Sequence, residues 1–273
     1  MIDNLISIFN LEFFRNAFIA AFIASITCGI IGTYIVARRI VFISGGITHA
    51  SFGGIGMGYY FGFDPILGAI VFGILSALGI EFFTKKADLR EDSAIAMLWA
   101  LGMALGVIFI FLTPGYAPNL MSYLFGNILT VSAEDLIYLF LLTVFVVGFF
   151  LTFYRMIIFV SFDEEYALTN NAPVRLFNAL LISLVALTIV LNIRVVGIIL
   201  VMSLLTIPQA IANLFTKRFD IMMIYSILFG FAGSVTGLAF SYVYDIPSGA
   251  AIIFCLVVIY AITKSAFLLR RKG

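Results

Sequence analysis

The sequence predicts an all-α integral membrane protein, a polytopic helical bundle that forms a single transmembrane domain over residues 1–273. Hydrophobic residues make up 63% of the chain and charged residues only 11%, whereas soluble proteins contain roughly half and about a quarter. Apolar runs recur along the whole sequence, with only short polar stretches between them. Because a transmembrane helix needs about 20 apolar residues, a chain of this length holds about eight to ten of them.

We expect nine transmembrane helices, placed by the apolar runs at residues 16–37, 47–63, 66–84, 93–112, 133–154, 174–192, 195–215, 219–243 and 248–269. An odd number of spans puts the two termini on opposite sides of the membrane. If the C-terminus lies in the cytoplasm, Arg15 and Arg194 are the only two of the 15 basic residues that face outside. The positive-inside rule therefore predicts an outer N-terminus and a cytoplasmic C-terminus.

The second predicted helix carries small residues at every fourth position. From its start they are Gly46, Ala50, Gly54 and Gly58, and this spacing places them in one row on the helix surface. Small side chains let helix backbones approach closely in lipid, where packing replaces the hydrophobic driving force. The row is therefore predicted to form the contacts of this helix with its neighbours.

The only histidine of the chain, His49, lies in the adjoining row of the same helix. A polar side chain that faces lipid has no hydrogen-bond partner, so the imidazole is expected to point toward other helices or a cavity. Neutral imidazole is the commonest protein ligand for transition metals. A metal ligand and a hydrogen-bonded packing residue are the two interpretations of His49, and a metal site would need further ligands from other helices.

Two connections are longer than the others. Residues 113–132 begin as an outer loop, and their apolar second half is too short to span, which indicates a short re-entrant or interfacial helix. Residues 155–173 form the largest inner loop, and within it residues 162–168 are expected to form a short helix with three adjacent carboxylates. This helix is either a docking surface for a cytoplasmic partner or part of a solvated loop.

Few polar residues fall inside the predicted spans. Glu81 lies near the inner end of the third span, within reach of water or of a lysine pair. Pro208 removes a backbone donor from the seventh span and should kink it. Gln209 and Asn213 follow one turn apart and would share a face, where they could line a polar path.

Several chemistries are absent from the sequence. It contains neither the phosphate-binding loop of nucleotide-binding proteins nor a His-Glu-x-x-His metalloprotease pair, and no nucleophile and base pair supports an intramembrane enzyme. None of the 14 acidic residues falls clearly at mid-membrane depth, where a self-powered proton or sodium antiporter keeps its carboxylates. Cys28 and Cys255 lie in apolar runs, where thiols behave as small hydrophobic groups. A net charge of +1 on a membrane protein gives no reason to expect nucleic acid as a partner.

Six stretches, in order along the chain, carry a resemblance to a known family. They are residues 38–43 with 48–54, residues 91–96, residues 123–129, residues 162–167, residues 196–201 with 207–208, and residues 245–250. They resemble the membrane-spanning permease of ATP-binding-cassette (ABC) importers for zinc, manganese or iron. The resemblance covers nearly the whole chain and implies a single permease domain in the bacterial cell (inner) membrane.

The resemblance also implies roles for particular residues. His49 matches a metal ligand of the translocation pathway, and Asp245 and Met57 could supply further ligands. A coupling helix that docks into the ATPase subunit matches the six residues Phe162, Asp163, Glu164, Glu165, Tyr166 and Ala167. The expected assembly contains two permeases and two cytoplasmic ATPase subunits, which bind the ATP, and an extracellular or periplasmic metal-binding protein delivers the ion. Lipid surrounds the permease, which has no enzymatic activity and no cofactor of its own.

One departure from the family pattern bears on the metal. The family commonly has an aspartate four residues before the histidine, whereas this chain has Gly45. Manganese, which prefers oxygen ligands, would lose one there, so zinc is favoured, with manganese or iron as the other candidates. The alternative function is a stand-alone proton-coupled secondary carrier in which His49 or Glu81 handles the proton.

Overall fold

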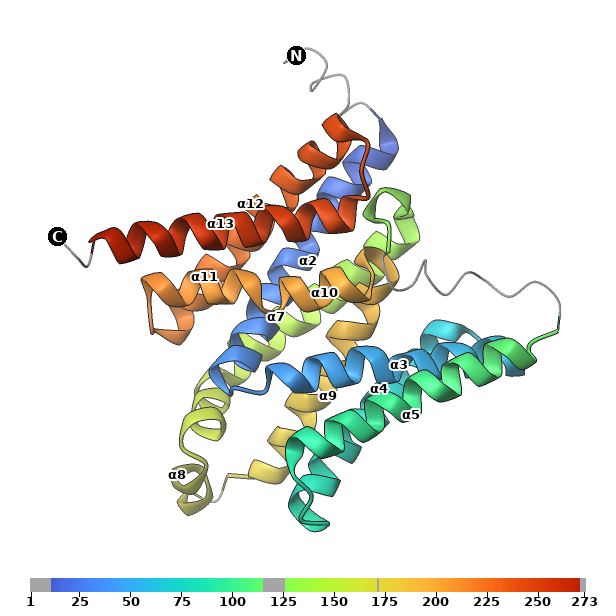
Figure 1. Cartoon of the computed structure of the whole chain (residues 1–273). Helices are drawn as coiled ribbons and strands as arrows, with labels where there is room; N and C mark the ends of the chain where they lie inside the picture. The colour runs from blue at the N-terminus through green and yellow to red at the C-terminus, as the bar shows by residue number, and fades with distance from the viewer. Residues whose placement is uncertain (1–10, 115–125, 171, 271–273) are drawn as a thin grey trace. The chain divides into compact units, whose positions relative to one another are not determined.

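The computed structural model describes residues 11–114, 126–170 and 172–270, and within these ranges every regular element is a helix (Figure 1). In chain order the helices are α2 (Glu12–Ala37), α3 (Val41–Phe61), α4 (Pro65–Lys86), α5 (Glu91–Leu112), the 3₁₀ turn η1 (Ile128–Thr130), α7 (Ala133–Phe162), α8 (Glu164–Thr169), α9 (Val174–Val196), α10 (Ile198–Leu204), α11 (Ile207–Phe215), α12 (Phe219–Tyr244) and α13 (Ser248–Arg270).

The described part of the chain contains eight helical segments long and apolar enough to cross a membrane, with α10 and α11 counted as one segment. A further long helix, α3, has 21 residues and is less apolar because glycines and short hydroxyl side chains replace larger apolar ones. Together these segments correspond to the nine predicted spans and confirm a polytopic all-α membrane protein. The sidedness of the termini stays a prediction. The predicted re-entrant helix falls largely on residues 115–125, outside the described residues.

The turn between α3 and α4 shows how the local sequence sets helix ends. Gly62 terminates α3 in the left-handed conformation, with a φ of 75° that favours glycine. Asp64 then caps α4, because its Oδ1 accepts hydrogen bonds from the backbone N–H groups of Ile66 at 2.6 Å and Leu67 at 3.2 Å. Pro65 occupies the first turn, where backbone N–H groups have no acceptor within the helix, so the missing N–H of proline costs no hydrogen bond.

Two predicted segments differ in the structure. Helix α7 does not end at residue 154 but continues to Phe162, with one non-helical residue, Phe153, at φ −106° and ψ 17°. The charge of Arg155 does not end the helix, because an apolar run follows it and keeps the same helical packing. In the seventh span the kink expected at Pro208 is a break between α10 and α11, and Pro208 lies in the first turn of α11.

The helices form two compact units, each discontinuous in sequence. The first contains α2, η1, α7 up to Val147, and α10 to α13; the second contains α3, α4, α5, the rest of α7 from Gly148, α8, and α9 up to Ile193. That both units belong to one permease domain stays a prediction. In the first unit α12 packs against α11 and α13, and Gly233 and Gly237 lie against Leu256 and Ile252 of α13.

Candidate functional site

The first two members of the predicted row of small residues bring α3 against α5. A Cβ placed on Gly46 would overlap the side chain of Ile95, at 2.7 Å from its Cγ2. The next member of the row, Ala50, presents its backbone to Gly102, where a Cβ would overlap the Ala50 Cα. The two helix backbones are therefore in direct contact, and α3, α4 and α5 run side by side (Figure 1).

The later half of the same row contacts α4 instead. A Cβ on Gly54 would overlap the carbonyl of Gly68, and a Cβ on Gly58 would overlap the Cα of Pro65. The change of partner follows from helix geometry, because a step of four residues advances about 40° around the axis beyond a full turn. Over three steps the row therefore turns by about 120°, from α5 to α4.

His49 lies between these contacts and stacks on Trp99 of α5. The two ring centroids are 4.1 Å apart and the ring planes differ by 5°. The imidazole is half-buried, and its Nδ1 is buried without a hydrogen-bond partner among the residues that the structure describes. A packing histidine would be expected to use this nitrogen in a hydrogen bond. The stack thus fixes the ring while leaving Nδ1 unpaired, as a metal ligand requires.

The other candidate ligands are placed elsewhere. Met57 is partly buried on α3, two turns after His49, and the helical rise separates their backbones by about 12 Å. Asp245 lies in the first unit, where it ends α12 in the left-handed conformation with a φ of 52° and is exposed. Within the described ranges, no three His, Cys, Asp or Glu side chains form a group that could hold a metal ion. Gly45, one turn before His49, is buried and has no side chain to contribute.

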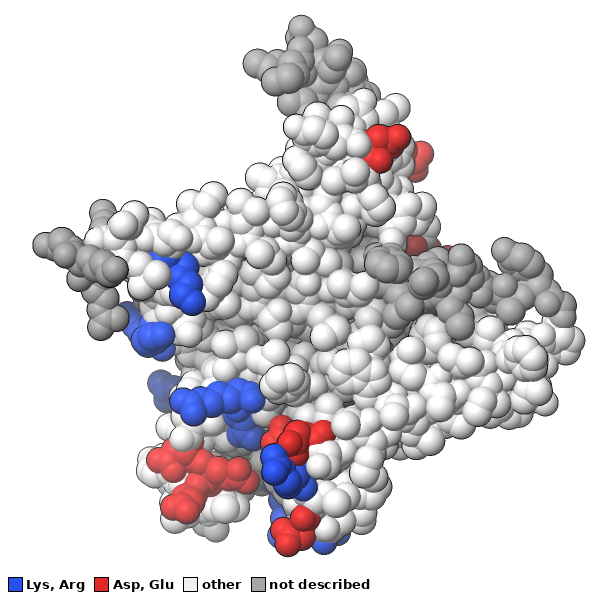
Figure 2. All heavy atoms as spheres, viewed as in Figure 1, with Lys and Arg blue, Asp and Glu red and all other residues white. Residues whose placement is uncertain are grey.

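The short helix predicted in the inner loop is present as α8. Asp163 caps it, because its Oδ1 accepts a hydrogen bond of 2.9 Å from the backbone N–H of Tyr166. Glu164 and Glu165 form the first turn, where negative charge interacts favourably with the helix dipole, and both are exposed. Figure 2 shows acidic side chains gathered over this helix.

One buried side chain packs α8 against the neighbouring helices. Ala167 is 2% exposed and packs in a cluster with Val160 of α7 and with Val174 and Phe177 of α9. The exposed side chains of α8, with that of the last residue of α7, instead combine aromatic, apolar and acidic groups. We call this set the α8 surface: Phe162, Glu164, Glu165, Tyr166 and Leu168. A face of this composition suits a protein partner better than water alone.

A hydrogen bond connects the segment beneath α8 with the start of α3. Arg38 Nη1 donates to the backbone carbonyl of Val160 at 2.7 Å. Val160 also belongs to the cluster that holds Ala167, and Arg38 stands just before the first residue of α3, Val41. Within the second unit, the helix that bears His49 and the helix that bears the α8 surface are thus linked through Val160.

Some buried polar residues were not singled out by the sequence. Asn178 and Asn192 of α9 are buried, and both side-chain polar atoms of Asn178 lack partners among the described residues. The sequence feature that could have identified them is an asparagine within an otherwise apolar helix. Gln209, expected on a polar path, is fully buried; its Nε2 donates to the carbonyl oxygens of Cys28 at 2.8 Å and Leu204 at 3.1 Å. Cys28 and Cys255 are both free thiols.

In the described part of the chain, eight helical segments long and apolar enough to cross a membrane define a multi-pass membrane protein. The model of the ABC 3 transport family matches residues 10–266, and the chain belongs to that family. It is therefore a membrane-spanning subunit of the ABC class of transporters, located in the cell membrane.

Individual relatives agree with the family. The manganese transport system membrane protein MntC of Halalkalibacterium halodurans is 33% identical, over 92% of this chain and 86% of the relative. An uncharacterized membrane protein of Synechocystis is 41% identical, over 96% of this chain and 94% of the relative. Among solved structures, PsaBC from Streptococcus pneumoniae in complex with Fab is similar with a TM-score of 0.87 and 30% identity, covering 96% of this chain and 95% of that chain.

Proposed function

We propose that this chain is the permease subunit of an ATP-driven importer of divalent transition metal ions. The observation that carries the proposal is His49, the only histidine of the chain, which is stacked on Trp99 with a buried, unpaired Nδ1. The names of relatives support the same cargo class, since a protein 33% identical to this one is named for manganese transport. Neutral imidazole binds zinc, iron and manganese, so His49 serves as a ligand on the pathway.

Two observations bear on which ion is carried. Gly45 leaves the position one turn before His49 without an oxygen ligand, which favours zinc. Two relatives that are 33% and 32% identical to this chain are named for manganese transport, which favours manganese. Among the described residues no three His, Cys, Asp or Glu side chains gather around this place, so a transport assay has to compare both ions directly.

The proposed assembly is a homodimer of permeases with two ATPase subunits, fed by an extracellular or periplasmic metal-binding protein. The α8 surface supports a cytoplasmic partner, because it exposes Tyr166 at 50% and Leu168 at 56% beside two carboxylates. ATP binds to the partner subunit, since this chain carries no phosphate-binding loop. The link from α8 through Val160 to Arg38 gives the partner a route to the helix that bears His49.

The alternative, a proton-coupled carrier that works alone, is less well supported. Glu81 lies in the last two turns of α4, near the helix end rather than at mid-depth. Membership of the ABC 3 transport family also favours an ATP-driven mechanism.

The function is tested by transport into vesicles that contain the purified permease with or without its ATPase subunit. We expect accumulation of radioactive zinc or manganese only when the ATPase subunit, ATP and the metal-binding protein are all present, and the faster of the two ions identifies the cargo. Uptake by the permease alone under a pH gradient would support the secondary carrier and contradict the proposal.

Charge reversal on α8 tests the coupling. We expect Glu164→Lys with Glu165→Lys to lower ATP-driven uptake at least about tenfold, because truncating charged groups at a buried interface costs roughly 2–5 kcal/mol of binding. The measurement is uptake together with co-purification of the ATPase subunit. The matched control is Glu12→Lys, which reverses an exposed carboxylate in the first turn of α2. Normal uptake by the double variant would remove the α8 surface from the mechanism.

A further inference from the structure

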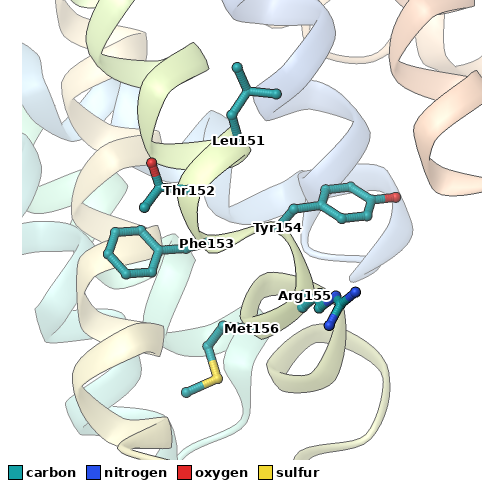
Figure 3. Close-up of a pocket in the computed structure, with 6 residues that line it drawn as sticks. All are labelled: Leu151, Thr152, Phe153, Tyr154, Arg155 and Met156. Atoms are coloured by element: carbon teal, nitrogen blue, oxygen red, sulfur yellow. The ribbon is translucent and has the colours of Figure 1, made fainter.

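Helix α7 has a hollow on its surface at the point where it bends. The hollow has a volume of about 460 Å³ and is lined by six consecutive residues, 151–156 (Figure 3). The bend is at Phe153, whose φ of −106° and ψ of 17° lie outside the helical range. A non-helical residue interrupts the backbone ladder of a helix and opens a gap between adjacent turns. All six lining residues belong to the second unit.

The only charged side chain that lines the hollow is Arg155. It is exposed, and it takes part in none of the three ion pairs with carboxylates that the described residues form. In the view of Figure 3 its guanidinium extends to the same side of the helix as the phenol of Tyr154. A guanidinium has a planar set of donors that matches two oxygens of a phosphate group. The polar part of the hollow thus suits a phosphate monoanion or diester.

Among the apolar lining residues, Leu151 stands four residues before Arg155, a spacing that places two side chains on one face of a helix, whereas the ring of Phe153 extends to the side opposite Arg155 (Figure 3). Leu151 is 76% exposed and Phe153 is 40% exposed. The ring of Phe153 is held in place by Phe149 and Phe177, with centroid distances of 5.0 Å and 5.4 Å. A ligand with a phosphate and an adjoining hydrocarbon part would therefore contact Arg155 and Leu151.

The depth of the hollow agrees with the level of lipid head groups. Helix α7 begins at Ala133, and with a rise of about 1.5 Å per residue Phe153 lies about 30 Å along it. That length equals the thickness of the hydrocarbon core of a bilayer, about 30 Å. Arg155 therefore stands just beyond the hydrocarbon boundary. With the predicted orientation this boundary is the cytoplasmic one, where anionic lipids attract basic residues.

We propose that this hollow binds the head group of an anionic phospholipid of the cytoplasmic leaflet, with Arg155 on the phosphate and with Leu151 against the first part of the acyl chains. The site is separate from His49 and from the α8 surface, and it does not depend on the cargo. It precedes by only a few residues the end of α7, where α8 begins, so a bound lipid would hold the segment that carries the α8 surface.

Lipid binding by the purified full-length chain tests the proposal. We expect native mass spectrometry to show at least fivefold more retained phosphatidylglycerol than phosphatidylcholine for the wild type. Arg155→Gln should abolish this preference and Arg155→Lys should keep part of it, because lysine retains the charge but not the planar donors. The matched control, Arg175→Gln, removes another exposed arginine of the second unit and should leave the preference unchanged.

Two further measurements separate the outcomes. Millimolar inorganic phosphate should not displace the lipid; displacement by phosphate alone would identify the occupant as a free anion and overturn the proposal. A photoactivatable phosphatidylglycerol should crosslink the wild type within residues 151–156, and this readout needs no variant to fold. Crosslinks confined to other helices, or an unchanged preference in Arg155→Gln, would each overturn the lipid site.

Discussion

Replacement of His49 by alanine should abolish most ATP-driven metal uptake at limiting metal while the permease still folds and binds its ATPase subunit. His49 is the only imidazole of the chain, and its Nδ1 has no hydrogen-bond partner in the described part of the structure. Mutation of a group that only hydrogen-bonds to a metal ligand typically lowers metal affinity about 10–100-fold. Loss of a direct ligand should therefore lower uptake by at least about 100-fold. The measurement is initial uptake against metal concentration in vesicles that hold the complete transporter.

The same assay separates a ligand from a packing residue. Trp99→Phe keeps an aromatic ring beneath His49 and should retain most uptake, whereas Trp99→Ala releases the imidazole and should weaken the apparent metal affinity. Both rings lie at the surface of the second unit, since Trp99 is 37% exposed and His49 half-buried. The thermal stability of His49→Ala and its co-purification with the ATPase subunit provide the control. Uptake at the wild-type rate by a stable His49→Ala variant would leave His49 as a packing residue only.

The sequence predicted His49 because a histidine in an apolar helix is rare and needs a reason, but it did not predict Trp99. A stack between two helices depends on how α3 and α5 are set against each other along their axes, and no pattern within one helix determines that. The same limit applies to the glycines. The row on α3 was recognisable from its spacing, whereas its partners Gly68 on α4 and Gly102 on α5 were not singled out by the sequence and became visible only through packing.

Helix ends show which local signals are decisive. The start of α8 was predictable because Asp163 and the two glutamates after it form a typical helix start. The end of α7 was not predictable. A basic residue such as Arg155 is typical of a membrane boundary, so the predicted span ends at residue 154. A helix can nevertheless continue into the cytoplasm after its last membrane-embedded turn. The boundary of a span and the end of a helix are different quantities, and hydrophobicity measures only the first.

The metal ligands beyond His49 could not be predicted for a different reason. A metal site collects donors from several helices, and this chain has no second histidine and no carboxylate one turn away on α3. Met57 was a candidate for a further ligand, but the helical rise separates its backbone by about 12 Å from that of His49. Ligand sets of this kind are a property of tertiary and quaternary structure, so sequence spacing can nominate the first ligand and not the others.

Replacement of Gly54 by leucine should prevent the permease from accumulating as a folded protein. A Cβ at this position would overlap the backbone carbonyl of Gly68 on α4. A backbone cannot move aside as a flexible side chain can, so α3 and α4 would have to separate. Overpacking in a core typically costs about 1–3 kcal/mol, which for a chain of this size lowers the Tm by roughly 2–12 °C. Gly54→Ala should show this smaller effect, and Gly54→Leu a larger one.

A glycine elsewhere in the same unit provides the matched control. Gly148 is in α7, and a Cβ there would meet no atom of the described residues within 4 Å. Gly148→Ala should therefore raise stability slightly, by up to about 1 kcal/mol, because alanine is the better helix former. The unfolding signal is the fluorescence of Trp99, the only tryptophan of the chain. If Gly54→Ala were as stable as Gly148→Ala, α3 and α4 would not approach as closely as described. The packing that sets His49 against Trp99 would then have to come from α5 alone.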